Sequence, residues 1–126
     1  AIGSIDPELE QIHRLVLAAN AAGRAACQPG PSAGSVDVAT RAVITAGGYG
    51  AYFTHRTGHG LGMEAHEAPY IYAENEEPLA PGMSFTIEPG IYLPGKGGVR
   101  IEDNVVITPD GANCLSSLPR ELIVIS

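Results

Sequence analysis

The chain changes character at Tyr49, and this change constrains its fold more than any other feature. Before Tyr49, apolar residues recur at helical spacing in two segments. The first segment begins at Asp6, which precedes a proline, and is expected to run to about Cys27. The second is expected to begin with Ser35 as its N-cap and to end at Gly47. The first part of the chain is therefore predicted to be a pair of amphipathic helices.

Short segments with the composition of β-strands follow Tyr49, and turn-forming residues separate them. The predicted strands are Ser84–Glu88, Val99–Ile107 and Leu122–Ile125, with Pro-Gly pairs and a Pro-Asp-Gly sequence among the turns. Helices followed by a run of strands are typical of α+β proteins. We therefore predict an α+β fold in which two helices pack on a mainly antiparallel sheet.

Charge and composition narrow the possible partners. The 126 residues carry 14 Asp and Glu against 7 Lys and Arg, a net charge of -7, which disfavours a nucleic-acid surface. No apolar run reaches the roughly 18 residues of a membrane span, and the start has no signal-peptide pattern, so we expect a cytoplasmic protein without membrane contact.

Two cysteines, Cys27 and Cys114, are too few for a disulfide scaffold. We expect buried free thiols, with one bridge as the alternative.

Three histidines and three glycines dominate the segment after the second predicted helix. His55, His59 and His66 lie within twelve positions, and glycines occupy positions 58, 60 and 62. Each glycine would cost a helix about 1 kcal/mol, so an irregular strand or loop is a better prediction than a helical zinc pair. Glycine also lets a ligand or another backbone approach closely. These features favour a functional site, and the alternative is a set of surface-loop histidines.

Two glutamates, Glu88 and Glu102, end or interrupt apolar strand segments. Strand alternation places Glu88 on the face of Thr86, and Glu102 on the face of Arg100 and Asn104. A carboxylate on a half-buried strand is costly unless it is paired or binds a metal. With an imidazole, these carboxylates predict a site for Mn²⁺ or Mg²⁺, and Co²⁺, Fe²⁺ or Zn²⁺ also suit such mixed ligands. The alternative is two solvent-facing glutamates, with Arg100 as an ordinary ion-pair partner of Glu102.

Three sequence segments together resemble one known family. The segments His55–Glu67, Pro81–Tyr92 and Gly98–Asp103 are similar to the C-terminal half of the catalytic domain of the Xaa-Pro peptidases, prolidase and aminopeptidase P. The resemblance implies the pita-bread metallopeptidase fold. It covers residues 1–126, so we expect the chain to be the C-terminal part of that domain, with the upstream half absent. Ala65 departs from the β-branched residue usual before the second histidine, with little expected consequence.

The resemblance also implies a role for each residue of these motifs. It implies three metal ligands, the last of which bridges two ions: His59, Glu88 and Glu102. His66 would contact the scissile carbonyl and stabilise the tetrahedral intermediate, and Glu88 would also move protons, so both would be catalytic. His55 would lie near the proline of the substrate and bind it together with His66. Arg100 would contact the ligand side chains rather than the metal.

The activity that the resemblance implies is metal-dependent hydrolysis of Xaa-Pro bonds in proline-containing di- or oligopeptides. The cofactor would be two divalent ions. Mn²⁺ and Co²⁺ are the first candidates, and Zn²⁺ and Fe²⁺ are the next. The family's site also takes two aspartates from an upstream strand pair, whereas Asp6 precedes a predicted helix and Asp37 lies within one. We therefore expect this chain alone to be an inactive fragment that binds metal weakly or not at all. An unpaired strand edge would make it a homodimer or an aggregate.

Three alternatives to an Xaa-Pro peptidase stay open. One is a non-catalytic binding module on the same fold. A second is an enzyme like the methionine aminopeptidases, which share the Gly-His-Gly and Thr-Ile-Glu-Pro sequences but usually lack Gly-Ile-Tyr and Val-Arg-Ile-Glu-Asp. The third is a metal-free hydrolase of the creatinase branch, which the presence of Glu88 and Glu102 disfavours.

Overall fold

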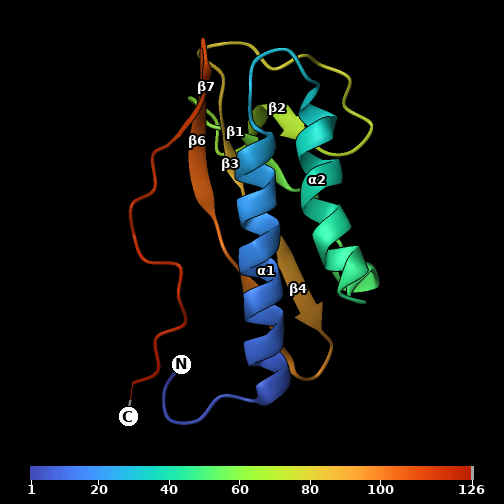
Figure 1. Ribbon diagram of the computed structural model, residues 1–126, viewed down its shortest axis with the longest axis vertical. Coiled ribbons are helices and arrows are strands. Elements are labelled where there is room, and N and C mark those ends of the chain that lie inside the picture. The colour runs from blue at the N-terminus through green and yellow to red at the C-terminus, as the bar shows by residue number, and fades with distance from the viewer. Residues whose placement is uncertain (126) are drawn as a thin grey trace.

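The computed structural model describes residues 1–125, and its helices precede its strands (Figure 1). Helices α1 (Pro7–Ala26) and α2 (Ala33–Ala46) come first, followed by the short 3₁₀ turn η1 (Gly50–Tyr52). The strands are β1 (Gly58–Gly60), β2 (Glu67–Ile71), β3 (Ser84–Ile87), β4 (Gly90–Leu93), β5 (Gly97–Arg100), β6 (Asp103–Thr108) and β7 (Gly111–Cys114). Across the described residues, the predicted α+β fold with two helices on a mainly antiparallel sheet is confirmed.

The start of α1 is as predicted, whereas the start of α2 is not. The Asp6 carboxylate caps α1 by accepting a hydrogen bond from the backbone N–H of Glu8 at 2.8 Å. The N-cap of α2 is Ser32, whose hydroxyl accepts from the N–H of Ser35 at 3.3 Å. The Ser35 hydroxyl donates to the Ser32 carbonyl at 2.6 Å inside the first turn. The prediction of Ser35 as the cap is therefore wrong, because the helix begins one turn earlier.

The strands form two separate sheets. One has the strand order β2-β1-β3-β6-β7, and all of its named pairs are antiparallel. The other is the antiparallel hairpin of β4 and β5. The chain crosses from the first sheet to the hairpin after Ile87 and returns before Asp103, the two residues that form the last register pair of β3 with β6. The sheets therefore meet at these two crossings.

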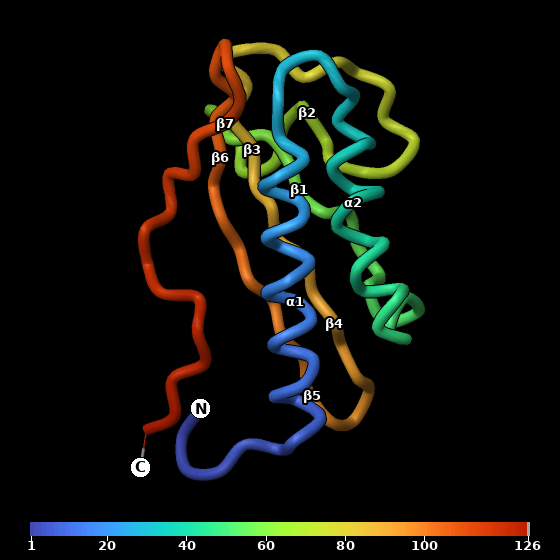
Figure 2. The backbone as a smooth tube through the Cα atoms, viewed as in Figure 1, coloured from blue at the N-terminus to red at the C-terminus, as the bar shows by residue number. Residues whose placement is uncertain are grey.

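Two of the predicted strands need correction. The segment Val99–Ile107 is not one strand, because it leaves the hairpin at Arg100 and enters the larger sheet at Asp103. Leu122–Ile125 is not a strand: its structure is irregular, apart from an isolated parallel bridge between Ile2 and Ile125. Figure 2 shows the chain after β7 running along one side of the molecule, with its end near the N-terminus. Its isoleucine and valine side chains are exposed. Its backbone pairs with the first residues of the chain, because Ile123 and Ile125 exchange hydrogen bonds with Ala1 and Gly3.

The helices cover one face of the sheets and hold two apolar clusters beneath them. One cluster joins α2 to the larger sheet through Val36, Phe85 and Val105. The other lies between α1 and the hairpin of β4 and β5, and it includes Ile12 and Ile91. Burial of these side chains is the main force that fixes the helices on the sheets.

Both cysteines are free thiols, as expected, but only one is buried. Cys27 lies in the core, and burial raises the pKa of its thiol to about 12. Cys114 is exposed on β7, so the expectation that it is buried is wrong. The helices that the structure describes include none that is long and apolar enough to cross a membrane.

Candidate functional site

Strand β1 passes between β2 and β3 at very short range, and its glycines make this possible. A Cβ atom on Gly58 would overlap the Thr86 carbonyl oxygen, and one on Gly60 would overlap the carbonyl oxygen of Ala68. The pairing of β1 with β2 also shifts register between the two glycines. The prediction of an irregular strand rather than a helix is confirmed. This strand holds the backbone of His59 between two closely packed neighbours, β2 and β3.

His59 and Glu88 are in direct contact. The Nε2 atom of His59 lies 3.1 Å from Oε1 of Glu88, and the two side chains are only 12% and 11% exposed. The Thr86 hydroxyl donates to the same carboxylate oxygen at 2.8 Å and accepts from the N–H of His59 at 3.0 Å. His59 Nδ1 lies 3.0 Å from the Gly60 carbonyl, which fixes the ring from its other side. One hydroxyl therefore links the backbone of His59 to the carboxylate of Glu88, and the resemblance implies that both residues are metal ligands.

A cavity of about 390 Å³ opens beside this pair. Its lining includes most of the predicted site residues and one that was not predicted: His55, Arg56, His59, His66, Glu88 and Arg100. The rings of His59 and His66 meet edge to face, with their centroids 4.3 Å apart. The three histidines thus share one cavity with a buried carboxylate, which is more than a set of unrelated loop histidines would give.

Arg100 connects the carboxylate to the other side of the cavity. Its guanidinium donates to Oε2 of Glu88 at 3.2 Å and to the Tyr92 hydroxyl at 2.7 Å. The Tyr92 oxygen in turn lies 3.1 Å from Nε2 of His55. Arg100 is therefore bonded to Glu88, whereas the open alternative from the sequence was an ion pair with Glu102.

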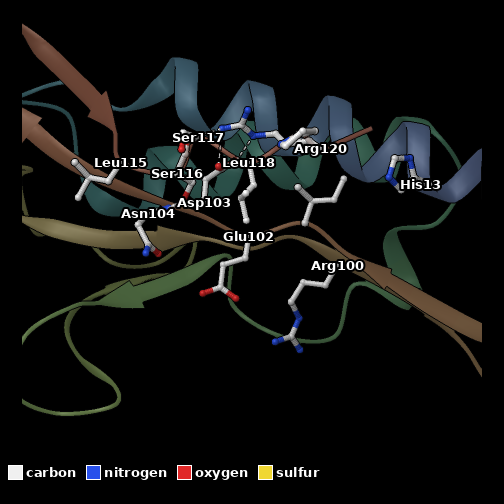
Figure 3. A pocket seen from close by; sticks show the side chains of 12 residues that line it. His13, Arg100, Glu102, Asp103, Asn104, Leu115, Ser116, Ser117, Leu118 and Arg120 are labelled. Atoms are coloured by element: carbon white, nitrogen blue, oxygen red, sulfur yellow. Dashed lines mark hydrogen bonds and ion pairs between the residues drawn. The ribbon is translucent and has the colours of Figure 1, made fainter. Parts of the chain in front are cut away.

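Glu102 lies outside this cavity. Its side chain is exposed and lines a neighbouring hollow of about 560 Å³, which Arg100 also borders. Figure 3 shows the side chains of Glu102 and Arg100 directed away from Asp103, which is bonded to Arg120. This agrees with the predicted alternation of side chains, although Glu102 lies between β5 and β6 rather than on a strand. In the part of the chain that the structure describes, no group of three or more His, Cys, Asp and Glu side chains is arranged to hold a metal ion.

The donor atoms that do meet suit a divalent metal. An imidazole nitrogen beside a carboxylate oxygen is a ligand pair that Mn²⁺, Co²⁺, Fe²⁺ and Zn²⁺ accept. The hydrogen bond from Thr86 to Glu88 and the ion pair with Arg100 would orient that carboxylate, as residues around metal ligands commonly do. His59 and Glu88 could therefore hold an ion, and Glu102 lies in the crossing between β5 and β6, two residues after Arg100.

A brace between α2 and the start of the site was not predicted. The buried carboxylate of Asp37 accepts from the hydroxyl of Thr57 at 2.7 Å and from Arg41 at 2.9 and 3.0 Å. Arg41 also donates to the carbonyls of Phe53 and His55, each at 2.9 Å. The i, i+4 spacing of Asp37 and Arg41 was a visible sign of an ion pair, but its distant partners were not.

Comparison with known proteins identifies the family. The family model Peptidase_M24, described as "Metallopeptidase family M24", matches residues 1–109. The "Probable dipeptidase PepE" of Mycobacterium tuberculosis is 48% identical over 125 residues, which are 99% of this chain and 33% of that protein. The "Xaa-Pro dipeptidase" of Pyrococcus furiosus is 46% identical over 122 residues, which are 97% of this chain and 35% of that protein.

A solved structure gives the same result for the fold. The crystal structure of dipeptidase PepE from Mycobacterium ulcerans matches with a TM-score of 0.96 and 48% sequence identity, over 99% of this chain and 34% of that one. The chain thus spans about a third of the length of the proteins it matches. The predicted resemblance and the pita-bread fold are confirmed. The chain belongs to metallopeptidase family M24.

Proposed function

We propose that residues 1–126 are the C-terminal part of the catalytic domain of a peptidase that hydrolyses Xaa-Pro bonds with the help of divalent metal ions. The observation that carries this proposal is the contact of His59 with Glu88, in a cavity that His55 and His66 also line. The names of similar proteins support the substrate class, since one is an Xaa-Pro dipeptidase. The activity belongs to the whole protein, of which this chain would supply part of the site.

The residues that would hold the metal ions in this proposal are His59, Glu88 and Glu102. The ions would be Mn²⁺ or Co²⁺, with Zn²⁺ and Fe²⁺ as the next candidates. When bound, they would lower the pKa of a water molecule and polarise the peptide carbonyl. This chain has three of the five side chains that the resemblance implies. We therefore expect weak metal binding and no hydrolysis when the chain is alone.

The other side chains of the cavity would bind and orient the peptide. The exposed ring of His66 would donate a hydrogen bond to the oxygen of the scissile carbonyl and stabilise its developing charge. His55 would lie against the proline, and its contact with Tyr92 fixes its orientation. Glu88, bonded on both oxygens, would accept and return a proton at its carboxylate. The proposed partner is thus a proline-containing di- or oligopeptide.

The proposed assembly is a homodimer, because an unpaired strand edge favours pairing with a second copy.

The test is proline release from Ala-Pro by the natural protein that contains this chain, with added Mn²⁺. We expect hydrolysis that a chelator abolishes, and little hydrolysis of Ala-Ala. Glu88→Gln should lower kcat/KM by about a thousandfold or more, because it removes a ligand and a proton acceptor. Glu76→Gln, a change at an exposed loop position, should leave it unaltered.

Three results would contradict the proposal. Hydrolysis that persists in the chelator would favour a metal-free mechanism. Faster release of methionine from Met-Ala-Ser than of proline from an Xaa-Pro substrate would favour a methionine aminopeptidase. No hydrolysis of any of these peptides by a folded, metal-supplied protein would favour a binding module.

A further inference from the structure

A buried amide from α1 reaches the backbone on which both proposed glutamate ligands are mounted. Asn20 is 0% exposed, in the middle of a helix face that is otherwise mostly apolar. Its Nδ2 atom donates to the carbonyl of Ile87 at 3.1 Å and to that of Ile101 at 3.4 Å. A polar group at such a place is costly unless it is hydrogen-bonded, so these two bonds account for an amide in the core.

The orientation of this amide is fixed by a second residue of α1. The Nε atom of Arg24 donates to Oδ1 of Asn20 at 2.8 Å and lies 3.5 Å from the carboxylate of Asp103. A guanidinium can only donate, so the amide oxygen faces Arg24 and the NH₂ group faces the two carbonyls. Asn20 therefore has a single orientation, in which both of its donors point at the sheets.

The two carbonyls lie at the crossings between the sheets. Ile87 directly precedes Glu88, which lies between β3 and β4. Ile101 directly precedes Glu102, which lies between β5 and β6. The register pairs of β3 with β6 end with Ile87 and Asp103, and beyond them the chain belongs to the hairpin. The Asn20 amide thus connects the two crossing segments just beyond the last register pair of β3 with β6.

We propose that Asn20 is a positioning residue that sets the separation of the Glu88 and Glu102 backbones, and through it the geometry of the metal site. This inference rests on the proposed function, because it takes both glutamates as ligands. Residues that hold metal ligands from behind typically alter metal affinity about 10–100-fold when they are removed. The hydrogen bonds of Asn20 join it to backbone carbonyls and to Arg24 rather than to either carboxylate, so its effect would pass through the backbone.

The test compares Mn²⁺ affinity in variants of the natural protein, measured from the loss of the free-ion EPR signal. Asn20→Ala should weaken binding about 10–100-fold. Asn20→Gln, which keeps the amide on a longer side chain, should recover part of this loss. Asn20→Ser keeps one hydroxyl proton, which can satisfy only one carbonyl, and replaces the alanine variant if that variant does not fold. Circular dichroism selects a temperature at which every variant is folded.

The matched control is Asn75→Ala. Asn75 also donates its amide to a backbone carbonyl, that of Tyr70 at 2.6 Å, and accepts from the N–H of Glu77, but it lies in the loop after β2. We expect this variant to lose stability without losing Mn²⁺ affinity. Equal affinity in Asn20→Ala and the unaltered protein, or an equal loss in Asn75→Ala, would overturn the inference.

A second readout separates this inference from the proposed function. The carbonyl ¹³C resonances of Ile87 and Ile101 report the hydrogen bonds that these groups accept, and the side-chain resonances of Glu88 and Glu102 report their order. If the unaltered protein binds no Mn²⁺, the proposed metal site fails, and these spectra then decide the inference. Shifts at all four residues in Asn20→Ala but not in Asn75→Ala support it, and unchanged glutamate resonances refute it.

Discussion

At the scale of single residues, the candidate site depends on how His59 and Glu88 are held. Thr86 does this with one hydroxyl, which accepts from the backbone of His59 and donates to the carboxylate of Glu88. Arg100 fixes the other oxygen of that carboxylate. The pair is therefore oriented by neighbours that come from the strand before Glu88 and from the hairpin after it.

The hydroxyl of Thr86 gives the first prediction. Thr86→Val keeps the shape of the side chain but leaves the N–H of His59 without its side-chain acceptor. We expect the free energy of unfolding to fall by about 1–3 kcal/mol, the cost of an unsatisfied buried group. Urea denaturation measures this loss. Thr86→Ser keeps the hydroxyl and is the control, and an equally large loss in the serine variant would show that packing rather than hydrogen bonding is responsible.

Most of the residues around the cavity could be predicted from the sequence, but their connections could not. Dense histidines among glycines identified His55, His59 and His66, which do share one cavity. The link from His55 through Tyr92 to Arg100 was not predictable, because it depends on how the hairpin folds back. The roles of these residues as ligands and catalysts remain predictions.

At the scale of elements, the short glycine-rich strand β1 positions His59 in the site. β1 is only three residues long, and two of them are glycines, yet it pairs with β2 on one side and with β3 on the other. Close approach of the neighbouring carbonyls leaves no room for a side chain at Gly58 or Gly60. The glycines therefore serve packing, in addition to any access that they give to a ligand.

The tight packing of β1 gives the second prediction. Gly58→Ala would push a methyl group into the Thr86 carbonyl, and we expect it to lower the free energy of unfolding by about 1–3 kcal/mol or more. Gly111→Ala is the control, because a Cβ atom there meets no atom within 4 Å. Its effect should stay within about 0.5 kcal/mol. Thermal unfolding of both variants tests this, and a neutral Gly58→Ala would contradict the described packing.

The helices were easier to predict than the strands, for physical reasons. Helix periodicity and the cap at Asp6 are local signals, and α1 lies where they place it. The cap of α2 was misassigned because two serines three residues apart can both act as caps, and only Ser32 precedes the helix. The break near Ile101 was missed because the crossing between sheets depends on distant pairing partners, and the apolar pattern runs on through it.

At the scale of the whole molecule, the last part of the chain is held by a buried ion pair and, at its end, by backbone hydrogen bonds to residues 1–3. Arg120 donates to both carboxylate oxygens of the buried Asp103, at 2.6 and 2.7 Å. Burial disfavours the charge on Asp103, but the hydrogen bonds from Arg120 outweigh it and hold the pKa of this carboxyl below its ordinary value. In the segment after Cys114, which contains no named strand, this ion pair is the contact that ties its middle to the larger sheet.

This ion pair gives the third prediction, a pH dependence of stability. A carboxyl with a lowered folded-state pKa contributes its full stability above its unfolded pKa, about 3.9, and loses it as the pH falls through the folded-state value. Arg120→Gln should lower the free energy of unfolding by about 1–3 kcal/mol at neutral pH. The difference in the free energy of unfolding between this variant and the unaltered chain should shrink below about pH 4.

Urea denaturation across the acidic range measures this difference. Arg120→Lys keeps the charge but loses the forked geometry of the guanidinium. Its free energy of unfolding should therefore lie between those of Arg120→Gln and the unaltered chain. A difference that stays constant down to about pH 2 would show that the Asp103 charge is not the cause.

The central claim concerns the place of the metal, and anomalous diffraction from crystals of the natural protein soaked in Mn²⁺ tests it directly. The account predicts anomalous peaks beside Nε2 of His59 and the carboxylates of Glu88 and Glu102, and their loss in His59→Ala. A bound ion among the other acidic side chains, or a folded protein with no peak beside these three residues, would contradict it.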